Sequence, residues 1–243
     1  MRNGRGIRIG LLIAAALCIA APSQVPAEQV AVLSLPRVPA ERLFGDREIH
    51  FTTMTQFARW TTLLARWQAE REDMAERCLS PHSFAAPCAP REWTDLVTRL
   101  RPLPLRAQLE AVNAAINAHP YVSAVDNWGD PARWETPFEF MRRNGQCQDY
   151  AIAKFLLLRE LGVPNDAMRL VVLRDVRRQV DHAVLVVTVD GEDLMLDNLA
   201  AGIVPAASAV DYRAYYSINQ TGWWLHLPNP LMPDGMARQV ASR

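Results

Sequence analysis

One cysteine stands where a long apolar segment begins, in the order Asn-Gly-Gln-Cys-Gln-Asp-Tyr, and it is the first candidate for chemistry. The segment predicts a helix that runs from Cys147 to about Leu161. Unpaired backbone N–H groups and the positive end of the helix dipole favour thiolate over thiol at such a position. Cys147 therefore fits a nucleophile, although a buried apolar residue, a disulfide partner or a metal ligand would also fit the pattern.

His182 is the candidate base, because it opens the apolar stretch His-Ala-Val-Leu-Val-Val-Thr-Val. Asp190-Gly191 after this stretch is typical of a two-residue hairpin turn, which pairs Val184 with Asp197. Side chains alternate along a strand, so His182 and Asp197 share one face, within reach of each other. A carboxylate beside an imidazole fixes its tautomer and stabilises the imidazolium, as in a Cys-His-Asp triad. A different turn would shift the register by one residue and separate the two side chains.

The elements that must position these residues form a helical part and a later strand part. Apolar residues recur at helical spacing over about 55–77, 91–100 and 105–118. The stretch Thr136-Pro137-Phe138-Glu139 is typical of a capped helix start, and that helix ends at Asn144-Gly145. Branched apolar residues predict strands over about 168–173, 183–189, 194–196 and 212–218. Helices followed by hairpin-linked strands predict an α+β fold with N-terminal helices packed on an antiparallel sheet.

The first 27 residues differ from the rest of the chain. Three arginines precede a short apolar run, and Val25-Pro26-Ala27 offers a small-residue cleavage site. The run is too short to span a bilayer comfortably. We predict a signal peptide over residues 1–27, with an uncleaved anchor as the alternative, and a periplasmic protein. Residues 28–243 are predicted to form a single domain, in which the proline-containing stretch 28–50 is an extended N-terminal arm.

Charge and cysteine content agree with export. The whole chain has equal numbers of basic and acidic residues, and removing the three leading arginines leaves it slightly acidic. A nucleic-acid partner is therefore not expected. Cys78 and Cys88 flank a short loop and are natural disulfide partners in an oxidising compartment, where such a bond stabilises the fold by roughly 3 kcal/mol. No histidines stand at metal-ligand spacing, so no zinc site is predicted.

These segments together resemble the bacterial transglutaminase-like cysteine proteinases. The resemblance lies in WETPFEFMRRNGQCQDYAIAKFLLLRELGVP, followed in order by DHAVLVV, LMLDNL and YYSINQTGWWL. It implies a papain- or transglutaminase-like fold in which the helix that begins with the cysteine packs on the sheet bearing the other two residues. It also implies that Cys147 is the nucleophile, His182 the base and Asp197 the orienting acid.

We therefore expect a cysteine peptidase that cleaves a protein through an acyl-enzyme. The backbone N–H of Cys147 would stabilise the oxyanion, and Trp128 and Asn127 are the candidates for a second donor. The resemblance implies a cell-surface adhesin of biofilms as one substrate and an inner-membrane regulatory receptor as a partner. Two alternatives are an acyltransferase that uses the same triad and a catalytically silent binding module.

Calcium is the cofactor that the resemblance implies, because characterised members carry acidic calcium ligands on both sides of the cysteine. Here the flanking residues are Gln146 and Gln148, whose amides are poorer calcium ligands than carboxylates. The acidic residues that remain as candidate ligands are Asp149, Asp126 and Asp130. We therefore predict no cofactor, and the same departure weakens the expectation that the substrate is an adhesin.

Overall fold

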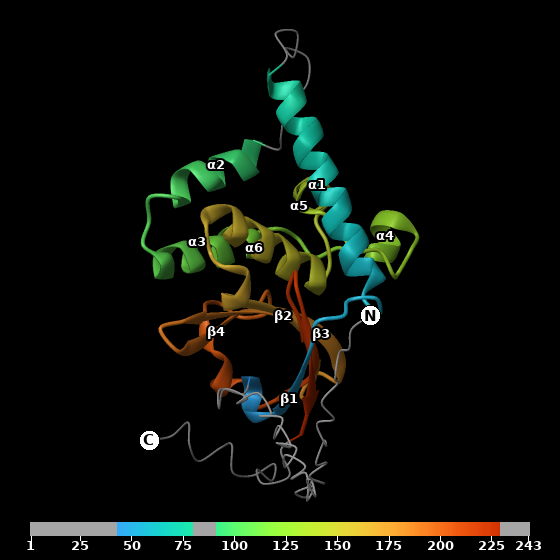
Figure 1. Cartoon of the computed structure of the whole chain (residues 1–243), viewed down its shortest axis with the longest axis vertical. Helices are drawn as coiled ribbons and strands as arrows, with labels where there is room; N and C mark the ends of the chain where they lie inside the picture. Colours follow the sequence, from blue (N-terminus) through green and yellow to red (C-terminus); the bar gives the residue numbers. More distant parts are fainter. Residues whose placement is uncertain (1–42, 80–90, 229–243) are drawn as a thin grey trace, which may run out of the picture. The chain divides into compact units, whose positions relative to one another are not determined.

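The computed structural model describes residues 43–79 and 91–228, all within one compact unit, Pro39–Arg243. Helices form one layer of this unit and an antiparallel sheet forms the other (Figure 1). The helices are α1 (Ala58–Leu79), α2 (Arg91–Leu100), α3 (Leu105–Asn117), α4 (Ala124–Trp128), α5 (Pro137–Arg143) and α6 (Cys147–Leu161). Short 3-10 turns are η1 (Leu43–Gly45), η2 (Asn165–Ala167) and η3 (Ala206–Ser208). The predicted α+β class is confirmed.

The sheet has seven strands within the described residues, and every neighbouring pair is antiparallel. The strands are β1 (Arg47–Phe51), β2 (Met168–Asp175), β3 (Val180–Val189), β4 (Glu192–Leu196), β5 (Val204–Pro205), β6 (Tyr212–Ile218) and β7 (Trp223–Leu227). Their order across the sheet is β1-β7-β6-β2-β3-β4-β5. The long strands β2 and β3 therefore lie near the middle of the sheet.

The hairpin between β3 and β4 has the register that the sequence predicts. Leu185 faces Leu196 and Val186 faces Met195 across the two strands. The turn residues Asp190 and Gly191 have φ values of 51° and 81°, and positive φ at both positions is what a type I′ turn requires. This register brings the start of β3 beside the residue that follows β4.

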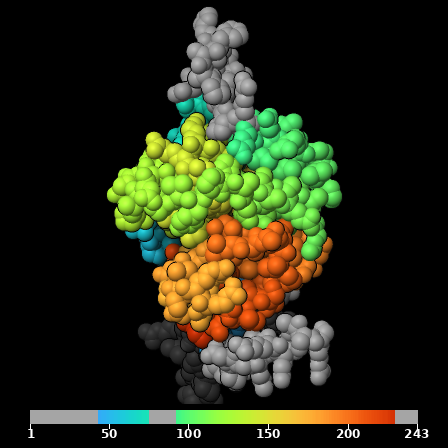
Figure 2. Space-filling view, turned by 180° about the vertical axis from the view of Figure 1, so that it is seen from behind, coloured from blue at the N-terminus to red at the C-terminus, as the bar shows by residue number. Residues whose placement is uncertain are grey.

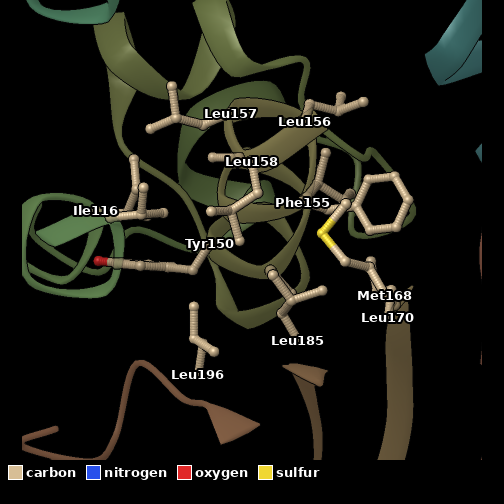
Figure 3. Packing of buried hydrophobic residues seen from close by; sticks show 14 of the residues in the cluster. Ile116, Tyr150, Phe155, Leu156, Leu157, Leu158, Met168, Leu170, Leu185 and Leu196 are labelled. Atoms are coloured by element: carbon tan, nitrogen blue, oxygen red, sulfur yellow. The ribbon is translucent and has the colours of Figure 1, made fainter. Parts of the chain in front are cut away.

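Helix α6 is buried along almost its whole length, which explains why its sequence is apolar on all sides. It contacts α2, α3 and α5 in its own layer and β2 and β3 in the sheet. Figure 3 shows Phe155 and Leu158 of α6 in the core with Leu170 of β2 and Leu185 of β3. Because α6 is packed on every side, its first residue is held in a fixed place relative to the sheet.

Aromatic residues from three helices pack against one another in the helical layer. Trp67 of α1, Trp93 of α2 and Phe138 of α5 meet edge to face, with ring centroids 4.7 to 6.0 Å apart. Such pairs contribute about 0.5–1.5 kcal/mol each beyond the area they bury. Seen from behind, the green helical residues lie directly on the orange strand residues (Figure 2). The Trp-rich segment is thus part of the core that supports α6.

A second, smaller core has no buried member from α6. Its buried members come from η1, the sheet and η3, and include Leu43, Val171, Leu173, Val184 and Met195. Since His182 alternates in phase with Val184, it belongs to this face of β3. The sheet therefore has apolar packing on both faces.

The sequence predicts an extended N-terminal arm over 28–50, and the structure describes this arm from Leu43 onward. In the described part of that arm, η1 and β1 are regular, and β1 pairs with β7. Ring stacking of Phe51 on Trp223 and of His50 on Trp224 supports the pairing. Partners so distant in sequence leave no local pattern, so β1 and β7 were missed.

Two further predictions fall on segments that lie outside the described residues. The side chain of Cys78 and the whole of Cys88 lie outside the described residues, as does the predicted signal peptide, so the disulfide and the signal peptide stay predictions. Among the described residues, no helix is both long and apolar enough to cross a membrane.

Candidate active site

Cys147 is the first residue of α6 and is half-buried. The turn before it is tight, because the backbone N–H of Gln146 donates to Oδ2 of Asp149 at 3.0 Å. A Cβ on Gly145 would lie 2.8 Å from the Cβ of Asp149 and 3.0 Å from a ring carbon of Phe140. Only glycine therefore fits at position 145, and this close approach fixes the entry of the chain into the helix.

His182 lies near the start of β3 and is 4% exposed. Its Nε2 lies 2.8 Å from Oδ1 of Asp197, the residue directly after β4. Burial lowers the pKa of His182, but hydrogen bonds with Asp197 and Cys147 and attraction to both outweigh it and raise the pKa to about 9. Because Nε2 is engaged by Asp197, Nδ1 is the ring nitrogen left for the thiol. The structure thus brings the three predicted residues together.

Asp197 accepts hydrogen bonds on both carboxylate oxygens. Oδ1 also accepts from the backbone N–H of Leu199 at 2.9 Å, and Oδ2 accepts from the phenol of Tyr212 at 2.6 Å. Burial raises the pKa of Asp197, but the bonds from His182, Tyr212 and Leu199 outweigh it, and the net pKa is lowered. The carboxylate is therefore ionised and fixed in orientation beside the imidazole.

Tyr212 was missed by sequence reasoning. It opens β6, and its ring meets that of His182 at 65° with centroids 5.9 Å apart. The sequence places β6 in the sheet, but no local signal states which strand faces the end of β4. A polar aromatic at the start of a predicted strand was the single available hint.

The two candidate oxyanion donors make other hydrogen bonds. The indole N–H of Trp128 donates to Oε1 of Glu135 at 2.6 Å, and the amide of Asn127 donates to the same oxygen at 3.0 Å. Asn127 also donates to the carbonyls of Arg143 and Asn144. Their role as second donor stays a prediction, and their observed contacts hold the loop before α5 instead.

The residues around Cys147 are hydrogen-bonded to one another and to the neighbouring backbone. Both oxygens of Asp149 accept hydrogen bonds, Oδ1 from the backbone N–H of Glu135 at 2.9 Å and Oδ2 from the backbone N–H of Gln146. The amide of Gln148 donates to the same Oδ2 at 3.3 Å, so a donor stands where a cation would have to approach. Within the part of the chain that the structure describes, no three His, Cys, Asp or Glu side chains form a group that could hold a metal.

The other acidic candidates are engaged elsewhere. Asp126 is exposed and accepts from the hydroxyl of Ser123 at 2.6 Å, while the exposed Asp130 accepts from the backbone N–H of Ala132 at 2.8 Å. Both contacts are local turn and cap interactions of the kind that short acidic side chains commonly make. Neither residue contributes to a shared group with Asp149.

A family model decides what kind of protein carries this site. It describes bacterial transglutaminase-like cysteine proteinases and matches residues 82–230, which is more than half of the chain. The chain belongs to this family. It is therefore a cysteine peptidase of the transglutaminase-like type, as the resemblance implied.

Two solved structures of LapG from Legionella pneumophila are similar to this proteinase. The EGTA-treated structure is 28% identical with a TM-score of 0.50, and the alignment covers 73% of this chain and 92% of that one. The calcium-bound structure is 26% identical with a TM-score of 0.50, over 75% of this chain and 98% of that one. No curated protein matches this proteinase by sequence.

Proposed function

We propose that this proteinase cleaves an exported protein through a triad of Cys147, His182 and Asp197. The observation that carries the proposal is the position of His182, which hydrogen-bonds to Asp197 and whose pKa is raised by Asp197 and by Cys147 at the start of α6. Membership of the family supports the peptidase reaction. The predicted signal peptide supports action in the periplasm, on a periplasmic or cell-surface protein.

The chemistry follows from these contacts. Nδ1 of His182 takes the proton of the Cys147 thiol, and the thiolate attacks the carbonyl carbon of the scissile peptide bond. The backbone N–H of Cys147 stabilises the oxyanion of the tetrahedral intermediate. His182 then gives its proton to the leaving amine, and a thioester remains on Cys147. Water, deprotonated by neutral His182, hydrolyses the thioester and restores the thiol.

Asp197 keeps the imidazole in place during these steps. Its carboxylate holds Nε2–H, so the proton that moves is always the one on Nδ1. It also stabilises the imidazolium that forms when Cys147 is deprotonated. Without the carboxylate, His182 could rotate or adopt the other tautomer.

We also propose that the activity does not depend on calcium. The amide of Gln148 donates to Asp149 beside the nucleophile, and its Oε1 accepts from the thiol of Cys147 at 3.7 Å. This amide therefore connects Cys147 and Asp149 within the first turn of α6 without a cation. The acidic pair that flanks the cysteine in calcium-binding members is absent here.

The experiment compares the exported and surface proteins of cells that carry the wild-type chain or Cys147→Ala. A substrate should show a new N-terminus in wild-type cells and an uncut chain in Cys147→Ala cells. Identical termini in both would overturn the proteolytic proposal. The purified substrate is then incubated with and without an added amine, because an amine adduct at the cleavage site would indicate acyl transfer in place of hydrolysis.

A further inference from the structure

The peptide that carries Asp197 is held by two side chains from the helical layer. Lys154 of α6 is fully buried, and its Nζ donates to the carbonyl of Leu196 at 3.3 Å. Asn117, the last residue of α3, donates its amide N–H to the carbonyl of Asp197 at 2.8 Å. Two consecutive carbonyls are thus each bound by a different helix.

This support matters because Asp197 lies just beyond the sheet ladder. The pairing of β4 with β3 ends at Leu196, and its pairing with β5 involves only Leu194 and Met195. Strand pairing therefore does not fix the backbone of Asp197. The donors from α3 and α6 supply the missing constraint at the residue whose side chain must face His182.

Burying the amine of Lys154 in the core costs free energy. Burial lowers the pKa of Lys154 to about 7, although attraction to Asp197 opposes the effect. Burying a charged amine costs free energy unless it is paired and hydrogen-bonded. An amine can donate a hydrogen bond whether or not it is protonated, so the bond to Leu196 survives at neutral pH. Stability alone thus gives no reason for a lysine at this position.

We propose that Lys154 and Asn117 are positioning residues that hold the peptide of Leu196 and Asp197 so that the Asp197 carboxylate faces Nε2 of His182. The inference rests on the proposed triad, because it assigns a task to residues that touch neither the thiol nor the imidazole. Helix α6 then contributes two residues to the site, Cys147 at its start and Lys154 two turns later.

The test uses Lys154→Met and Asn117→Ala in the full chain, with iodoacetate as the probe. This anionic reagent alkylates a thiolate fastest when an imidazolium lies beside it, so the rate falls when His182 loses its proton. A displaced Asp197 lowers the pKa of His182. We expect the alkylation rate to fall at a lower pH in both variants than in the wild type. The melting temperature of Lys154→Met should be unchanged or higher.

Asn113→Ala is the matched control, since Asn113 is a buried asparagine one turn earlier on α3. In this variant the alkylation rate should fall at the same pH as in the wild type. Should Lys154→Met fail to fold, Asn117→Ala decides the matter by itself. Variants that melt earlier but keep the wild-type profile would overturn the inference and leave only a structural role. A wild-type chain without any imidazolium-dependent alkylation would instead overturn the triad, so the two failures are distinguishable.

Discussion

Nε2 of His182 lies 2.8 Å from Oδ1 of Asp197, and both side chains are almost completely buried. This pair joins the start of β3 to the residue after β4, across a hairpin whose turn is the local signal Asp190-Gly191. Because the hairpin sets the register, the geometry of the pair follows from backbone pairing. The helix that begins with Cys147 then only has to pack at the right place over the sheet.

At alkaline pH the rate of the reaction should fall as His182 loses its proton. The pKa of His182 is raised to about 9, so below this pH the imidazolium is present beside the thiolate and can protonate the leaving amine. Above it the proton is lost and kcat/KM falls. Rates of substrate cleavage and of iodoacetate alkylation, measured from pH 6 to roughly 10.5, should decline together around this pH. A decline that begins near the ordinary pKa of histidine would contradict the assigned contacts.

Asp197→Asn should retain the shape of the site and remove its negative charge. Two of the contributions that raise the pKa of His182 come from Asp197, so the alkaline fall should move to lower pH. The rate constant kcat should fall by roughly 10²-fold or more, because the imidazolium loses its partner and the wrong tautomer is populated. Single-turnover cleavage of the substrate measures the effect.

Asp193→Asn is the control for that variant. Asp193 lies on the same strand β4, and its carboxylate accepts a surface hydrogen bond from Thr188 at 2.7 Å. This change should leave kcat and the pH profile as they are. Equal losses in the two variants would mean that β4 is merely sensitive to substitution.

Tyr212→Phe should remove one of the hydrogen bonds that orient Asp197. The phenol donates to Oδ2 at 2.6 Å, and losing it leaves that oxygen with one donor fewer. A lost bond to a buried charged group is worth about 1–3 kcal/mol, which corresponds to at least a several-fold drop in kcat or a matching loss of stability. The measurements are the free energy of unfolding in urea and kcat.

Tyr215→Phe provides the comparison for Tyr212→Phe. Tyr215 lies on the same strand β6, and its phenol donates to the exposed Asp181. Both changes remove one hydroxyl, but only the change at Tyr212 touches the triad. If kcat responds equally to both, the orienting role of Tyr212 is wrong.

Local signals in the sequence account for what could be predicted. The Asp190-Gly191 turn predicted the β3–β4 register, and the position of Cys147 at the start of a predicted helix marked it as a candidate nucleophile. Tyr212 and Asn117 could not be assigned, because each reaches Asp197 only through the packing of distant elements. Lys154 looked like an ordinary charged residue in an apolar run. Its burial depends on how α6 sits on the sheet, which no periodicity reveals.

Removing calcium should leave this proteinase active. Asp149 is saturated by the backbone N–H groups of Glu135 and Gln146 and by the amide of Gln148, so no cation is needed to hold it. Activity and melting temperature in EGTA should equal those in millimolar calcium. The double variant Gln146→Asp/Gln148→Glu restores acidic residues on both sides of Cys147, and we expect its melting temperature to rise when calcium is added.

A charge-matched control separates binding from general electrostatics. Gln56→Asp/Gln68→Glu adds the same two negative charges at exposed positions before and within α1. Its melting temperature should not respond to calcium, because isolated surface carboxylates provide too few ligands for the ion. Loss of wild-type activity in EGTA, restored by calcium, would show that the amide of Gln148 does not replace the cation. A calcium response in both double variants would mean that the ion acts only by neutralising surface charge.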